Sequence, residues 1–98
     1  MPNRGWRDIV ADLLEVAKTP TGKTAIMYKV VLSYDLLVEY LKMTQDAGLL
    51  ELDKQTGKYK TTNSGLKYLQ LFDSMNSLVY RKGMRLPHGI TLKRNYVN

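Results

Sequence analysis

Residues 33–62 read SYDLLVEYLKMTQDAGLLELDKQTGKYKTT, and this stretch decides the fold because its hydrophobic period changes midway. From Ser33 to about Ala47, apolar residues recur at the spacing of an amphipathic helix. Ser33 is a favoured N-cap, and Gly48 is the residue type that most often follows a helix. The sequence therefore predicts one helix between these two residues. Its expected inward stripe is Leu36, Leu37, Tyr40, Leu41, Met43 and Ala47.

The second half of the stretch alternates with a period of two, which is typical of strands. Leu50 and Leu52 alternate with acidic residues, and Tyr59 and Thr61 alternate with lysines. The turn-forming residues 54–57 lie between the two runs, so we expect a β-hairpin. An isolated hairpin is marginal in water, and this one must therefore pack on the rest of the chain.

Two further helical segments precede this stretch. Residues 4–18 are predicted to form an amphipathic helix, and a shorter apolar segment covers residues 23–32. Residues 19–22, with the sequence TPTG, separate them, because proline cannot continue a helix and glycine tolerates almost any backbone angle. The expected inward face of the first helix is Trp6, Ile9, Val10, Leu13, Val16 and Ala17.

A fourth helix is expected after the hairpin. Thr62 is its predicted cap, and it extends from Asn63 to about Lys82, near Gly83. The order of three helices, hairpin and helix predicts an α+β, mostly α, winged-helix fold. We expect one domain over residues 1–82, followed by an irregular basic tail over residues 83–98.

Charge is unevenly distributed along the chain. The 98 residues carry a net charge of +6, and the last eighteen residues contribute five cations and no acid. A nearly neutral body with a basic tail favours a polyanionic partner, although such a tail can also serve only solubility. No apolar run is long enough for a membrane span, so we expect a cytoplasmic, nucleoid-associated protein.

Catalysis and cofactor chemistry find no support in the sequence. Cysteine is absent, and the single histidine, His88, has no evident catalytic or metal-binding partner. The triplet Gly22-Lys23-Thr24 resembles the end of a phosphate-binding loop. The position five residues before Gly22 is Ala17 rather than the required glycine, and no strand precedes it. We therefore expect neither an enzyme nor a cofactor or metal site.

The predicted DNA-binding residues follow from the docking of helix-turn-helix proteins, in which the exposed face of the third helix enters the major groove. Val38 is expected to touch a thymine methyl, Lys42 a phosphate or a guanine, and Asp35 or Glu39 a cytosine amino group. The same helix face is acidic, so a solvated face that reads no bases is a nearly equal alternative. The full predicted set is Arg4, Arg7, Lys23, Thr24, Lys29, Ser33, Tyr34, Val38, Lys42, Lys54 and Lys58.

The wing lysines have an alternative role. Glu51 and Asp53 can face Lys58 and Lys60 across the hairpin, and lysines paired in this way contribute little to DNA binding. Lys54, in the turn, is the least affected.

The fourth helix carries more apolar surface than one domain needs. Leu66 and Leu69 are expected to pack on the body, whereas Leu71 and Leu78 widen a second stripe. That stripe has the spacing of a short coiled-coil seam, which predicts a homodimer. The alternative is a helix covered by its own C-terminal tail. The predicted dimer interface is Tyr68, Phe72, Met75 and Val79.

Several short motifs, in order, resemble a known family. They are Arg7-Asp8-Ile9, the run from Lys23 to Tyr28, Leu32-Ser33-Tyr34, Glu39-Tyr40-Leu41, Gly48-Leu49-Leu50, Tyr59, and Thr62-x-x-Gly65 before Tyr68-Leu69. Over roughly residues 4–80 the chain is similar to archaeal winged helix-turn-helix proteins described as transcriptional regulators, some of which are chromatin proteins. The resemblance implies binding of double-stranded DNA by a winged helix that often dimerises through its last helix. The basic extension after Lys82 has no place in that pattern.

Two other functions remain open. The acidic third helix suits a winged helix that binds another protein, since this fold serves both purposes. Tyr80, Tyr96 and the basic tail suit stacking on RNA or single-stranded DNA. A tail that follows a neighbouring groove of duplex DNA is a further hypothesis.

Overall fold

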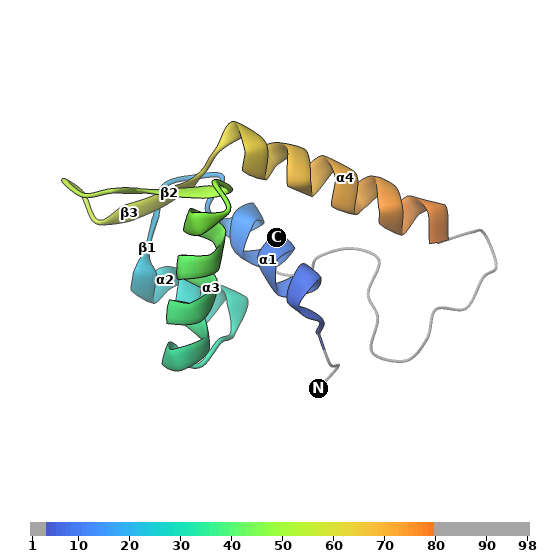
Figure 1. Ribbon diagram of the computed structural model, residues 1–98. Helices are drawn as coiled ribbons and strands as arrows, with labels where there is room; N and C mark the ends of the chain where they lie inside the picture. Colours follow the sequence, from blue (N-terminus) through green and yellow to red (C-terminus); the bar gives the residue numbers. More distant parts are fainter. Residues whose placement is uncertain (1–3, 80–98) are drawn as a thin grey trace.

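The computed structural model describes residues 4–79 and confirms the predicted order of elements (Figure 1). The predicted end of the last helix near Lys82 and the predicted irregular tail lie outside these residues. One element was not predicted, the two-residue strand β1. The elements are α1 (Trp6–Val16), β1 (Thr21–Gly22), α2 (Lys23–Val30), α3 (Tyr34–Asp46), β2 (Leu50–Asp53), β3 (Lys58–Thr61) and α4 (Asn63–Val79).

α1 is the centre of the domain, and its buried residues run without interruption from Ile9 to Leu14. Asp12 is among them, and its Oδ2 lies 2.8 Å from Nη1 of Arg4. A buried carboxylate needs such a partner. Trp6 differs from the prediction, because it is 50% exposed and not part of the core.

The buried face of α3 is narrower than the predicted stripe. Leu37, Leu41 and Thr44 are buried, whereas Leu36 and Met43 are exposed. Thr44 enters the core because its Oγ1 donates to the carbonyl oxygens of Tyr40 (2.7 Å) and Leu41. A hydrogen-bonded hydroxyl costs little free energy to bury. The buried face of α3 is therefore rotated relative to the stripe that its apolar residues alone predict.

The sheet is antiparallel with the order β1-β3-β2. Leu52 and Thr21 both pair with Tyr59, which places β3 in the centre. β1 escaped prediction because two residues cannot display a period, and because proline and glycine in residues 19–22 indicated only a break. The predicted hairpin is confirmed, with Gly57 at φ +72° in its turn.

The hairpin is fixed to α1 through Thr61. Its amide donates to the carbonyl of Ala17 (2.9 Å), and its Oγ1 donates to the carbonyl of Leu14 (2.6 Å). These two hydrogen bonds provide the packing partner that an isolated hairpin lacks. We call the β2–β3 hairpin the wing.

α4 begins as predicted, with Oγ1 of Thr62 accepting from the amide of Gly65 (3.1 Å). Leu69 and Phe72 then pack against the body, and the helix lies along α1 (Figure 1). Leu66 was expected to pack there too, but it is 40% exposed. Beyond Phe72, most described side chains of α4 are exposed, and this end of the helix projects past the body.

Candidate nucleic-acid interface

The turn between α2 and α3 sets the position of the exposed helix. Val31 adopts the left-handed conformation (φ 61°, ψ 63°), and Oγ of Ser33 then caps α3 by accepting from the amide of Leu36 (3.3 Å). Arg4 donates from Nη2 to the carbonyl oxygen of Val31 (3.2 Å) while it pairs with Asp12. The turn between α2 and α3 is thus tied to α1 through Asp12.

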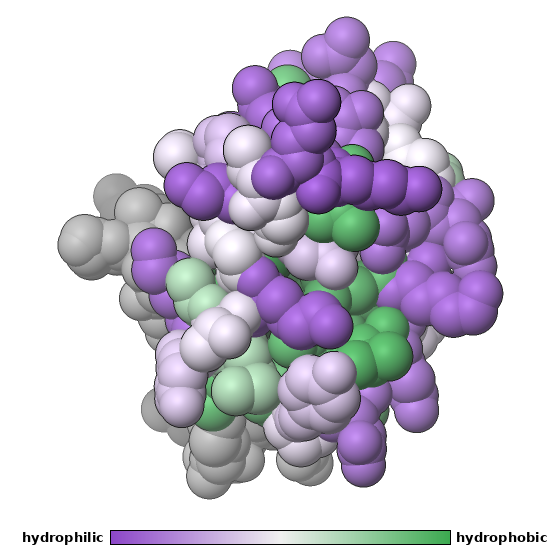
Figure 2. Space-filling view, turned by 90° about the vertical axis from the view of Figure 1, so that its left-hand side faces the viewer, coloured by the Kyte–Doolittle hydropathy of each residue, from purple (hydrophilic) through white to green (hydrophobic). Residues whose placement is uncertain are grey.

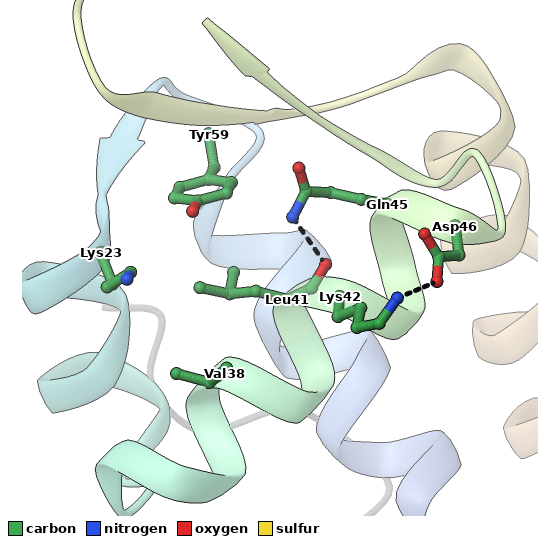
Figure 3. Close-up of a pocket in the computed structure, with 7 residues that line it drawn as sticks. All are labelled: Lys23, Val38, Leu41, Lys42, Gln45, Asp46 and Tyr59. Atoms are coloured by element: carbon green, nitrogen blue, oxygen red, sulfur yellow. Dashed lines mark hydrogen bonds and ion pairs between the residues drawn. The ribbon is translucent and has the colours of Figure 1, made fainter. Parts of the chain in front are cut away.

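One side of α3 meets α2 and the wing in a shallow depression of about 240 Å³ (Figure 3). The side chain of Leu41 lies at its centre, with Val38 below it in this view, Tyr59 of β3 above and Lys23 of α2 on one side. Lys42 lies on the other side. We call this depression the reading surface; it is lined by Lys23, Val38, Leu41, Lys42, Gln45, Asp46 and Tyr59.

The two lysines of the reading surface differ in their contacts. Nζ of Lys23 lies 5.4 Å from the ring centroid of Tyr34, a cation–π distance, and Lys23 forms no ion pair within residues 4–79. Nζ of Lys42 lies 3.1 Å from Oδ2 of Asp46, one helical turn on, with both side chains largely exposed. An exposed pair of this kind is worth at most about 1 kcal/mol, so Lys42 can exchange Asp46 for a phosphate at little cost.

The opposite flank of α3 is apolar rather than basic. Glu39 does not lie on the reading surface but lines a second open depression of about 250 Å³ with Trp6 of α1. We call this depression the notch; it is lined by Trp6, Leu36, Glu39, Tyr40 and Met43. The acidic residues of α3 are therefore distributed, because Glu39 lines the notch and Asp46 lines the reading surface.

The wing presents its lysines on two different sides. Lys58 and Lys60 lie opposite Asp53 and Glu51 in the register and share the outer sheet face with them. The expected cross-strand arrangement is confirmed, although within residues 4–79 none of the ion pairs joins these residues. Lys54 lies in the exposed turn. Figure 2, viewed from the side of α2 and the wing tip, shows hydrophilic residues above an apolar patch.

The structure brings only part of the predicted set together. Lys23, Tyr34, Val38 and Lys42 form one surface, and Thr24 and Lys29 are exposed on the adjoining α2. Lys54 and Lys58 lie on the wing, and Ser33 acts as the N-cap of α3.

Arg4 and Arg7 do not belong to the reading surface. Arg4 is engaged by Asp12 and the carbonyl oxygen of Val31. The guanidinium of Arg7 lies 4.6 Å from the centroid of the Trp6 ring, and its carbonyl oxygen accepts from the hydroxyl of Tyr68 on α4. Both arginines therefore stabilise the start of α1.

Four residues of the reading surface were absent from the predicted set: Leu41, Gln45, Asp46 and Tyr59. Gln45 belongs to the outer arc of α3, but a neutral side chain at this position does not indicate a phosphate contact. Tyr59 was recognised only as a strand residue, since its proximity to α3 depends on how the wing packs. The Lys42–Asp46 pair has the i,i+4 spacing that a sequence can reveal.

Comparison with known families gives one match. A family model described as winged helix-turn-helix matches residues 3–79, and this match agrees with the predicted fold. No curated protein matches the chain. Among the described residues, no group of three potential metal ligands is found, and no helix has the length and apolar character needed to cross a bilayer.

Proposed function

Because the chain belongs to the winged helix-turn-helix family, a family of typically non-enzymatic DNA-binding domains, we propose that it binds double-stranded DNA as a homodimer and regulates transcription or compacts DNA. The observation that carries the proposal is the reading surface, where an apolar centre lies between the amines of Lys23 and Lys42. DNA offers the matching chemistry, since its phosphates flank base edges that carry apolar methyl groups.

The start of α2 adds backbone and hydroxyl donors to the lysine charge as support for phosphate contact. Gly22 is its N-cap and has no side chain to accept from the first free amides of the helix. Lys23 and Thr24 occupy the first turn, so a phosphate there would meet free amides, a hydroxyl and an ammonium. We propose that one phosphate binds at this helix end.

The dimer is proposed through α4, with a stripe shifted from the predicted seam. Tyr68 and Phe72 stack on each other at 6.2 Å, and Phe72 is buried within its own subunit. The remaining stripe is Leu71, Met75, Leu78 and Val79, whose exposed fractions range from 48% to 77%. Leu71, Met75 and Leu78 have coiled-coil spacing on a helix end that projects from the body, which suits pairing with a second copy.

DNA binding is tested by fluorescence anisotropy of a random-sequence duplex at about 50 and 200 mM salt. We expect micromolar binding that weakens steeply with salt. Lys23→Ala and Lys42→Ala should each reduce the log–log slope by about 0.9, because each lysine that contacts a phosphate releases counterions. Lys67→Ala is the matched control, since Lys67 is exposed on α4, away from the reading surface. Absence of binding at low salt, or equal loss in the control, would refute the proposal.

The dimer is tested by light scattering. Leu71→Glu combined with Leu78→Glu should convert the dimer to a monomer, because two charges would be buried in the seam. Gln70→Glu combined with Ser77→Glu adds the same charge at exposed positions of α4 outside the stripe, and the dimer should survive. A wild-type chain that is monomeric at the concentration used for DNA binding would contradict the dimer.

A second candidate function is protein binding through α3. Asp35, Glu39 and Asp46 are three exposed carboxylates on α3, and this charge favours a basic protein surface over phosphate. Charge reversal of Asp35 and Glu39 to lysine separates the two functions. It should strengthen DNA binding if α3 faces DNA, and it should leave DNA binding unchanged if α3 faces a protein.

A further inference from the structure

We infer that the reading surface prefers A·T to G·C base pairs because Val38 contacts the 5-methyl group of thymine in the major groove. This inference rests on the proposed DNA binding and adds the class of sequence that is bound. The thymine methyl is the only apolar group that a base pair presents in that groove.

The reading surface has an apolar area between its two lysines. Val38 is 40% exposed, and it lies beside Leu41 and Tyr59, both nearly buried. A methyl group placed there would be removed from water against these three side chains. The lysine amines flank the apolar centre, where they can hold the phosphates on either side of a base pair.

Arginine, the usual ligand of guanine, is absent from α2, α3 and the wing. Arginine, which reads O6 and N7 of guanine with two parallel hydrogen bonds, does not occur between residues 8 and 80. Lys42, the one cation of α3, shares its charge with Asp46. A G·C pair would therefore meet no arginine at its two acceptors, and the amines of Lys23 and Lys42 are those proposed to hold phosphates.

The amide of Gln45 is a further polar group of the reading surface. Its Nε2 donates to the carbonyl oxygen of Leu41 (3.0 Å), and Oε1 points away from Leu41 toward the side of the wing (Figure 3). Facing a purine, this oxygen accepts from N6 of adenine and repels O6 of guanine, but facing a pyrimidine it accepts from N4 of cytosine, so Gln45 alone does not select A·T. Asp35 and Glu39 do not discriminate between A·T and G·C, because adenine N6 and cytosine N4 both donate to a carboxylate. Glu39 also lies in the notch, away from the reading surface.

The experiment measures the affinity for four duplexes of equal length by fluorescence anisotropy at one salt concentration. They alternate adenine with thymine, adenine with uracil, guanine with cytosine, and hypoxanthine with cytosine. Uracil lacks only the 5-methyl group. Hypoxanthine with cytosine keeps the major groove of G·C but lacks its minor-groove amino group.

We expect the thymine duplex to bind tightest. Loss of each contacted methyl should weaken binding about fourfold, from about 0.8 kcal/mol per buried carbon. The two cytosine duplexes should bind equally and more weakly. Val38→Ala should remove the thymine-over-uracil difference, whereas Met43→Ala, an exposed apolar residue of the notch on the same helix, should keep it.

The other outcomes of the binding experiment separate failure of the A·T preference from failure of DNA binding itself. Equal binding of thymine and uracil duplexes, or a difference that persists in Val38→Ala, overturns the inference and leaves DNA binding intact. Hypoxanthine with cytosine binding as tightly as adenine with thymine overturns it as well, since the preference would then come from the minor groove. Failure to bind any duplex refutes the proposed function itself.

Discussion

At Gly65, α4 lies close to the turn between α3 and β2 and to the end of β3. A Cβ on this residue would collide with the carbonyl oxygen of Leu49 and the methyl group of Thr61. The first contact is with backbone and cannot relax by a rotamer change. The Thr62-x-x-Gly65 motif therefore combines the N-cap of α4 with a close contact between α4 and the backbone of Leu49 that only glycine permits.

We expect Gly65→Ala to lower the free energy of unfolding by about 1 to 3 kcal/mol, because overpacking exceeds the gain in helix propensity. Chemical denaturation measures the change. Gly22→Ala is the control, since a Cβ there meets nothing within 4 Å and its φ of −76° suits any residue. Equal losses in the two variants would show that the crossing at Leu49 is not the cause.

Val31 carries backbone strain in the turn before α3. It is a β-branched residue in the left-handed region, which costs roughly 1–2 kcal/mol, and it is 62% exposed. Val31→Gly should raise the free energy of unfolding by about 0.5 to 1 kcal/mol, since relief of strain exceeds the added entropy of the unfolded chain. Thermal denaturation checks this, with Val31→Ala expected to gain less. A lower melting temperature for Val31→Gly would contradict it.

Single residues also show where prediction from sequence fails. Thr44 is buried because its hydroxyl is satisfied within α3, and Trp6 is half exposed because it lines the notch. Hydrophobic periodicity treats the first as polar and the second as core, so it misplaces both. The N-caps Ser33 and Thr62 were predicted correctly, because capping depends on residues within three positions.

Between elements, Tyr68 links α4 to the start of α1. Its hydroxyl donates to the carbonyl oxygen of Arg7 (3.0 Å). Burial raises the pKa of Tyr68, with Arg7 opposing and Asp8 adding to the rise. The folded state thus holds the phenolic proton more tightly than the unfolded state does.

This shift predicts a pH dependence of stability. The contribution is complete below the unfolded tyrosine pKa of about 10 and is lost as the pH rises through the folded pKa. At neutral pH, Tyr68→Phe should cost about 0.5 to 1.5 kcal/mol for the lost hydrogen bond. The difference from wild type should shrink above pH 10, as followed by urea denaturation. Tyr28→Phe, at a residue 72% exposed on α2, is the control. A difference that stays constant to high pH would contradict the assignment.

The elements themselves were largely predictable. α3 and the wing follow from a change of period within thirty residues, and their bounds differ from the prediction by one or two positions. β1 was not predictable, since its two residues gain their strand character only by pairing with β3. Packing between distant elements decides such short strands, and no local pattern records it.

At the scale of the whole molecule, the candidate site was half predicted. Lys23, Tyr34, Val38 and Lys42 converge as expected, because the helix-turn-helix order fixes how α2 meets α3. Arg4 and Arg7 lie outside the reading surface, since sequence alone does not show that Asp12 pairs with Arg4 or that the Trp6 ring lies against the guanidinium of Arg7. The basic tail, residues 83–98, lies outside the described residues.

The central claim is that duplex DNA binds where α2, α3 and the wing meet, and NMR chemical-shift mapping of the ¹⁵N-labelled chain tests it most directly. On titration with a short duplex, we expect the largest shifts at the amides of Lys23, Tyr34, Val38 and the wing turn. The amides of Leu71 to Val79 on α4 should shift little. Shifts centred on the notch around Trp6 and Met43, or no shifts at low salt, would contradict the claim.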